Sequence, residues 1–109
     1  MEPDWIDLRR RLLEATGADA ALDQVLAAAF GQTVAPFTSS VDASRALVAA
    51  ALPGWRLHLG YDVSGMFPYA SLAKDGIRVI SDAPTVPLAV LRSAVAAKAC
   101  PAPSSPPPA

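Results

Sequence analysis

The hydrophobic and polar positions of the first half of the chain follow a helical period. Three segments carry their larger apolar side chains three and four residues apart, which places them on one face of a helix. Each segment opens at or near a residue that caps helices and closes at a glycine or proline: Asp4 to Gly17, Ala18 or Asp19 to Gly31, and Ser39 or Ser40 to Pro53. The pattern therefore predicts three helices, of which the first two form either a hairpin or one helix bent at "TGAD".

After Pro53 and Gly54 the period of the pattern changes from about 3.6 to about 2. Four large apolar residues alternate with polar or small ones: Trp55, Leu57, Leu59 and Tyr61 against Arg56, His58, Gly60 and Asp62. Such alternation is typical of a strand with one face on the core, so we expect the apolar set to be buried and His58 to point away. We also expect this strand to be the central one of its sheet.

Two further strands follow in the sequence. The first runs from about Phe67 to Lys74, where Pro68 indicates an edge strand or the start of a strand. "IRVIS", residues 77–81, is the second. Between them, "DG" at residues 75 and 76 is a strong hairpin signal, because a type I′ turn needs a positive φ at both positions.

A last helix is predicted after Thr85, its N-cap, with Pro87 in the first turn. Its apolar stripe consists of Leu88, Leu91 and Val95. From residue 101 onward, "PAPSSPPPA" has no helix or strand pattern and predicts a disordered tail that favours polyproline II.

The predicted elements give an α+β fold: N-terminal helices, a three-stranded antiparallel β-meander and a C-terminal helix packed on the sheet, as an α-β-β-β-α sandwich. We expect one domain over residues 1–100, with a helical lead-in at 1–35, a sandwich core at 36–100 and the tail at 101–109. The chain is 52% hydrophobic, but much of that is alanine, so few large side chains anchor the core. The expected anchors are Trp5, Leu8, Leu12, Leu22, Phe30, Leu47, Trp55, Leu57, Leu59, Tyr61 and Leu91.

The net charge and the lengths of the apolar segments indicate which classes of partner to expect. The formal net charge is -1, so the chain lacks the basic field of a general nucleic-acid binder, and nucleic acid is not expected as the primary partner. Its apolar runs are shorter than the roughly 20 residues that cross a bilayer, and Met1 is followed by an acidic residue instead of a signal sequence. We expect a cytoplasmic protein without a membrane partner. The single Cys100 agrees with a reducing compartment.

His58 is the one histidine and the natural candidate for catalysis. A general base needs an orienting group and a nucleophile within hydrogen-bond reach. Arg56 and Asp62 lie on its predicted face, and Ser71 or Ser81 lies across the sheet, yet none stands at a motif spacing. One histidine and one distant cysteine also supply no metal-ligand cluster. We therefore expect a non-enzymatic protein without cofactor or metal, and a site built on His58 and Asp62 is the least favoured alternative.

The segment "GYDVSGMFPY" is the more interesting surface. It brings together side chains of the types enriched at protein interfaces, and the candidate partner-binding residues here are Tyr61, Asp62, Met66, Phe67 and Tyr69. Alternatively, these side chains point inward and complete a thin core.

The arginines in "DLRRRLLE" form a second candidate surface. Arg9, Arg10 and Arg11 could meet an acidic partner or a phosphate backbone, and we include Arg9 and Arg10 among the candidate partner-binding residues. Three consecutive residues spread around a helix instead of forming a stripe, so a solvated helix face is the alternative.

Two segments, "PFTSSVDASRALVAAALPGWRLHLGYD" and "RVISDAPTVPLAVLRSAVAAKA", resemble the phage ABA sandwich domain, a family of small phage and prophage proteins. The resemblance extends from about Phe37 to Ala99. It implies the fold and a phage origin. The family is known chiefly as a domain without an assigned activity, so the resemblance carries over no catalytic residue.

These observations together predict a protein that acts by stoichiometric binding to a host protein or protein complex. Its most concrete form is an inhibitor of a host defence complex, in the manner of an anti-CRISPR protein, which rests on the implied phage origin and the small size. One alternative is a structural or accessory phage protein that forms a homodimer through sheet edges or alanine-rich helix faces. Another is a weak nucleic-acid-binding module that uses Arg9, Arg10, Arg11 and Arg56.

Overall fold

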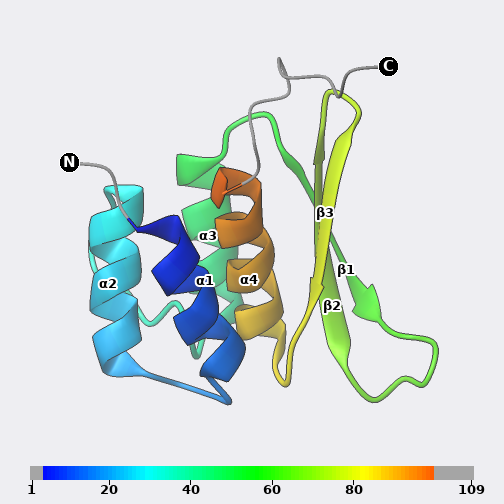
Figure 1. Ribbon diagram of the computed structural model, residues 1–109, viewed down its shortest axis with the longest axis horizontal. Helices are drawn as coiled ribbons and strands as arrows, with labels where there is room; N and C mark the ends of the chain where they lie inside the picture. The colour runs from blue at the N-terminus through cyan, green and yellow to red at the C-terminus, as the bar shows by residue number, and fades with distance from the viewer. Residues whose placement is uncertain (1–3, 100–109) are drawn as a thin grey trace.

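The computed structural model describes residues 4–99, which form four helices and one three-stranded sheet (Figure 1). The elements are α1 (Trp5–Glu14), α2 (Ala20–Phe30), α3 (Val41–Ala51), β1 (Arg56–Tyr61), β2 (Pro68–Lys74), β3 (Ile77–Asp82) and α4 (Val86–Ala99). Their order confirms the predicted α+β class. The predicted tail at 101–109 and Cys100 lie outside the described residues. None of the helices within residues 4–99 is long and apolar enough to cross a membrane.

Each helix begins at a side-chain oxygen that accepts a hydrogen bond from the backbone N–H three residues on. The caps are Asp4, Asp19, Ser40 and Thr85, at 3.0, 3.0, 3.1 and 3.3 Å. α1 and α2 are separate helices, and α1 ends at Glu14, earlier than the predicted stop at Gly17, because Ala15 already has an extended backbone. Gly31 closes α2 in the left-handed conformation, with φ 67°.

The sheet is antiparallel in the order β1-β2-β3, so β2 is the central strand. The prediction that β1 is central was wrong, because in a meander the strand between two hairpins pairs with both neighbours. Pro68 is the first residue of β2, one of its two predicted places. Asp75 and Gly76 have φ of 51° and 82°, which confirms the predicted turn.

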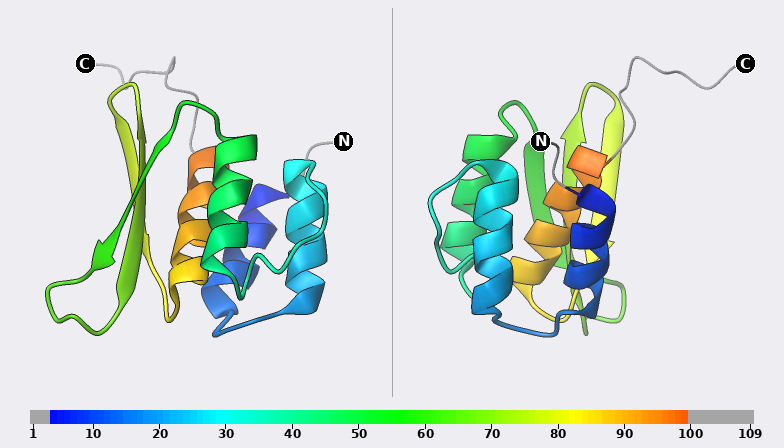
Figure 2. Two further views of the ribbon diagram at one scale, coloured as in Figure 1. Left: turned by 180° about the vertical axis from the view of Figure 1, so that it is seen from behind. Right: turned by 60° about the vertical axis from the view of Figure 1, so that its left-hand side comes forward.

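All four helices lie on one side of the sheet (Figures 1 and 2). α4 packs directly on β2 and β3, α1 and α3 pack on α4, and α2 packs on α1. No helix among the described residues covers the opposite face of the sheet. On that open face, paired residues of the three strands form rows across the sheet. One register row is Arg56, Ala73 and Arg78, and the row next to it is His58, Ser71 and Ile80.

α4 lies at the centre of the fold and is buried on most sides. The sequence predicted a narrow apolar stripe, but the structure buries a wider set: Pro87, Leu88, Ala89, Val90, Leu91, Ser93, Ala94, Val95 and Ala97. The reason is that the sheet covers one side of α4 while α1 and α3 cover others.

β1 is covered less well than the other strands, because α4 packs chiefly on β2 and β3. Leu57, Leu59 and Trp55 face the core side and are half-buried. Tyr61, predicted to be buried with them, is 63% exposed. It continues the same face of the strand, but it stands at the end of β1, outside the buried core.

The connection between α2 and α3 is anchored by a buried polar contact. Thr38 donates to the Asp23 Oδ1 from both its backbone N–H and its hydroxyl, each at 2.8 Å. The Thr38 hydroxyl also accepts from the Asp19 backbone N–H at 2.8 Å. Because Thr38 and Asp23 are both buried, this contact fixes the connection against the N-terminal end of α2.

Candidate protein-binding loop

Residues 62–67 join β1 to β2 in a loop closed by its own backbone. The Asp62 N–H donates to the Phe67 carbonyl at 3.0 Å, and the Gly65 N–H donates to the Asp62 carbonyl at 2.9 Å. Gly65 has a φ of 73°, in the left-handed region that favours glycine. The chain therefore reverses direction in a turn that is closed by backbone hydrogen bonds.

The side chain of Asp62 organises this loop from within. Its Oδ1 accepts a hydrogen bond from the Ser64 hydroxyl at 2.6 Å and another from the Met66 N–H at 3.2 Å. These bonds favour the carboxylate, and the bond from Ser64 contributes most to lowering the pKa of Asp62. The loop thus carries a negative charge at neutral pH, and that charge fixes the backbone beside Met66.

Large apolar side chains gather on the outside of the loop. Tyr61, Val63, Met66 and Phe67 are 63%, 109%, 72% and 45% exposed. Beyond these, the described residues expose only four more large apolar side chains: Ile6, Leu13, Val34 and Ile80. The loop bends away from the helical layer at one end of the sheet (Figure 2). Of the two arrangements left open by the sequence, the structure has Tyr61, Met66 and Phe67 exposed, and Val63, Met66 and Phe67 are the exposed apolar patch of the loop.

Tyr69 lies apart from that patch, on the open face of the sheet. It stands opposite Gly60, and a Cβ atom built on Gly60 would come within 2.8 Å of the tyrosine ring. The ring therefore covers the glycine, and its centroid lies 6.1 Å from that of His58. Tyr69 is half-buried in this position and belongs to the sheet surface.

His58 is exposed on the same open face, opposite Ser71, as the alternation predicted. No hydrogen bond joins its imidazole to another group within residues 4–99. Asp62, further along the same strand face, directs its Oδ1 to Ser64 and Met66.

Arg9 and Arg10 lie on α1, in the helical layer, and the structure does not bring them to the loop (Figure 1). Arg10 forms ion pairs with Asp7 at 2.5 Å and with Glu14 at 2.9 Å on its own helix. The hydrogen bond and the charge of Asp7 raise the pKa of Arg10. Arg9 is exposed.

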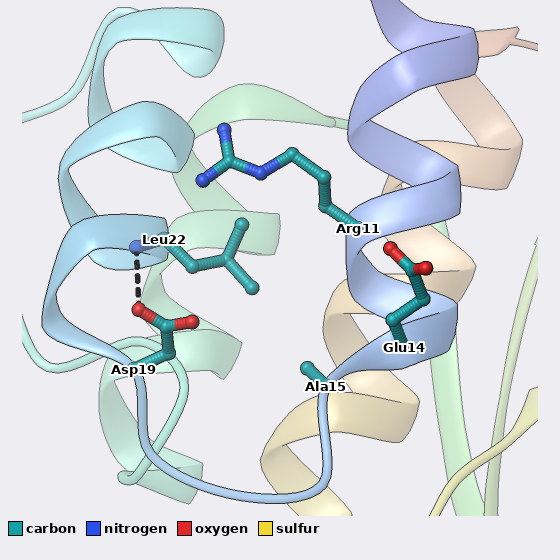
Figure 3. A pocket seen from close by; sticks show the side chains of 5 residues that line it. All are labelled: Arg11, Glu14, Ala15, Asp19 and Leu22. Atoms are coloured by element: carbon teal, nitrogen blue, oxygen red, sulfur yellow. Dashed lines mark hydrogen bonds between the residues drawn. The ribbon is translucent and has the colours of Figure 1, made fainter.

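A shallow pocket of about 200 Å³ lies between α1 and α2, lined by Arg11, Glu14, Ala15, Asp19 and Leu22 (Figure 3). Arg11 extends from α1 over Leu22, while the Asp19 carboxylate accepts the Leu22 N–H and so caps α2. The pocket is rimmed by charges of both signs. Within residues 4–99 no three His, Cys, Asp or Glu side chains come close enough to hold a metal ion.

A second recess, of about 210 Å³, lies at the base of the loop. It is lined by Phe67, Asp82, Ala83, Pro84 and Arg92. Arg92 donates from Nη1 to the Asp82 carbonyl at 2.8 Å, so this side chain fixes the end of β3 beside the loop. We did not predict this role, although one arginine within the apolar sequence of α4 is the signal that could have indicated it.

Comparisons with protein-family models, with curated proteins and with solved structures found no match to this chain. The resemblance to the phage ABA sandwich domain therefore stays a prediction from the sequence.

Proposed function

We propose that this chain is a non-enzymatic protein-binding module, and that Val63, Met66 and Phe67 of the 62–67 loop are the residues that dock. The observation that carries the proposal is the apolar patch at the loop tip, where side chains 109%, 72% and 45% exposed stand close together in the sequence. Contiguous exposed apolar patches on small proteins commonly mark interaction sites.

The internal bonds of the loop support this proposal, because a loop fixed before binding loses little conformational entropy on binding. Met66 is held by the Asp62 carboxylate at 3.2 Å, and Phe67 by the Asp62 N–H at 3.0 Å. Both apolar side chains are thus presented from an ordered backbone.

The chemistry of the loop also indicates the partner. Asp62 is ionised at neutral pH and is the single charged residue between Tyr61 and Phe67. A complementary surface has an apolar recess that accepts Met66 and Phe67, with a basic side chain at its rim. We propose a host protein with such a recess as the partner.

The more specific form of the proposal is inhibition of a host defence complex by stoichiometric binding. It rests on the sequence resemblance to a phage domain and on the small size of the chain. Its test is inhibition of a purified defence nuclease, where one chain per target gives full inhibition and loop variants lose it.

The test of the general proposal is affinity capture from native host cells with three forms of the chain. The first is the wild type, and the second carries Met66→Ser and Phe67→Ser. The matched control carries Ile6→Ser and Val34→Ser, which remove exposed apolar side chains far from the loop in sequence.

We expect the wild type and the control to retain one protein at a fixed stoichiometry, and the loop variant to bind it at least about tenfold more weakly. Equal retention by the loop variant would show that the loop does not dock. Failure of the wild type to retain any protein stoichiometrically would remove the proposal altogether.

A further inference from the structure

Among residues 4–99, no strand lies beside the outer edge of β1, because the sheet order is β1-β2-β3. Pro68, which lacks an N–H, directs its carbonyl to β3, where it accepts the Ala83 N–H at 3.1 Å. Tyr61 pairs with Pro68 in the β1–β2 register. Tyr61 and Pro68 therefore form a non-hydrogen-bonded pair, and the Tyr61 backbone groups point to the free edge.

The hydrogen bond of Asp62, the next residue, leads to the same conclusion about which backbone groups point to the free edge. The Asp62 N–H donates to the Phe67 carbonyl at 3.0 Å, so Asp62 directs its backbone toward β2. Since backbone direction alternates along a strand, Leu57, Leu59 and Tyr61 direct their N–H and C=O groups outward.

The sequence of this edge is chemically symmetric about His58. Read outward in both directions, "WRLHLGY" gives a leucine, then Arg56 or Gly60, and then an aromatic residue. If two copies of the strand pair antiparallel about an axis at His58, Leu57 faces Leu59 of the second copy and Trp55 faces Tyr61 of the second copy. Each apolar residue on the core side then meets an apolar partner.

The alternating directions of the backbone N–H and C=O groups along β1 fit this register. Leu57 and Leu59 direct their groups outward, so Leu57 and Leu59 of the second copy exchange both N–H···O=C bonds as a hydrogen-bonded pair. The two His58 residues then face each other as the closely spaced non-hydrogen-bonded pair at the centre. A register displaced by one residue would set each core-side leucine opposite a residue whose side chain lies on the open face.

Burial and charge favour the same register. The core-side face of β1 is incompletely covered, and a recess of about 230 Å³ lies beside the strand, lined by Arg45 of α3 and by Leu57, His58 and Leu59 of β1. Arg56 would lie diagonally opposite Asp62 of the second copy on the open face, within reach for long side chains. Both loop bonds to the Asp62 side chain end on Oδ1, so neither of them occupies Oδ2.

We infer that this chain forms a two-fold symmetric homodimer in which β1 pairs with β1 of a second copy about His58. The two sheets join into one antiparallel sheet with the helices of both copies on one face. The inference is independent of the proposed function, because Val63, Met66 and Phe67 lie beyond the paired strands and stay available to another protein.

Cross-linking tests the register. In a Cys100→Ser background, the His58→Cys variant should form an intermolecular disulfide under mild oxidation, because facing non-hydrogen-bonded residues bring their Cβ atoms within disulfide range. The matched control is Arg56→Cys, on the same face two residues away, whose cysteines would stand too far apart across the axis. Equal cross-linking of the two variants would overturn the register.

Light scattering and analytical ultracentrifugation of the wild type test the dimer itself, and a monomer at millimolar concentration would overturn it. Charge reversal at Arg56 tests the ion pair: Arg56→Glu should raise the dimer dissociation constant by about tenfold, because two such contacts form per dimer. Arg78→Glu is the control, in the same register row and on the same face but on β3, and should leave the constant unchanged. An equal effect of both reversals would contradict pairing through β1.

Discussion

Arg92 of α4 donates from Nε to the main-chain carbonyl of Leu12 over 3.0 Å, and so joins the central helix to the last turn of α1. The same guanidinium donates from Nη2 to the carbonyls of Leu13 and Ala15 at 3.1 and 3.4 Å, and from Nη1 to that of Asp82 at 2.8 Å. Carbonyls at the end of a helix have no partner within the helix, and a cation there also complements the helix dipole. One side chain thus connects α1, β3 and α4.

Replacing Arg92 with Met should lower the free energy of unfolding by about 2–3 kcal/mol, because the carbonyls lose a charged donor. Arg92→Lys should recover little, since an ammonium cannot reach several carbonyls from one planar group. The measurement is urea unfolding followed by tryptophan fluorescence. Arg78→Met, on the open sheet face, is the control and should change stability by less than about 0.5 kcal/mol. Equal effects at the two positions would show that the bonds of Arg92 contribute nothing.

Thr38→Val should cost about 1–3 kcal/mol of stability, although valine has nearly the same shape as threonine. The substitution removes the hydroxyl that donates to Asp23 at 2.8 Å and accepts from Asp19 at 2.8 Å, and both contacts lie in a buried or partly buried place. Thermal unfolding measures the loss. Ser39→Ala, at the exposed neighbour, should be nearly neutral, and a Thr38→Val protein as stable as the Ser39→Ala protein would contradict the role given to Thr38.

Gly60→Ala should displace the ring of Tyr69, because the new Cβ would lie 2.8 Å from ring atoms. We expect changed NMR shifts for the Tyr69 ring and for His58, with a loss of stability of up to about 1 kcal/mol. Gly17→Ala is the matched control, since no atom lies within 4 Å of a Cβ there. Unchanged Tyr69 shifts in the Gly60→Ala protein would show that the ring does not rest on the glycine.

The sequence predicted those features that depend on neighbours along the chain. Ser40, one of the two serines predicted for this place, caps α3. Gly31 closes α2, and Asp75 with Gly76 forms the turn, because capping and positive φ depend on local side-chain chemistry. The two periods, about 3.6 and about 2, separated helices from strands for the same reason.

Features that depend on contacts between distant elements were harder to predict. Alternation shows which residues of β1 share a face, but not which strands lie beside it, so β1 was expected at the centre of the sheet and lies at its edge. Tyr61 shares the alternation of Leu59, yet it stands beyond the core at the end of β1. Arg92 bonds to the carbonyl of Leu12, which precedes it by most of the chain, and no local pattern encodes that contact.

The loop that we propose as a docking site should loosen at acid pH, and the sign follows from the pKa of Asp62. Hydrogen bonds, that from Ser64 first, hold this pKa below the ordinary value for an aspartate. A lowered pKa means that the carboxylate stabilises the folded loop above the unfolded pKa, and that this contribution is lost as the pH falls through the folded pKa.

NMR titration of the Met66 amide measures this transition, since its N–H donates to the Asp62 Oδ1 at 3.2 Å. We expect a midpoint below that of an unstructured aspartate, and no such transition in the Asp62→Asn protein. The Asp62→Asn variant should also bind the partner more weakly at neutral pH, because Met66 loses its fixed position while its side chain is unchanged. A Met66 titration that persists in the Asp62→Asn protein would contradict the role given to this carboxylate, and unchanged partner affinity would mean that the order of the loop does not contribute to binding.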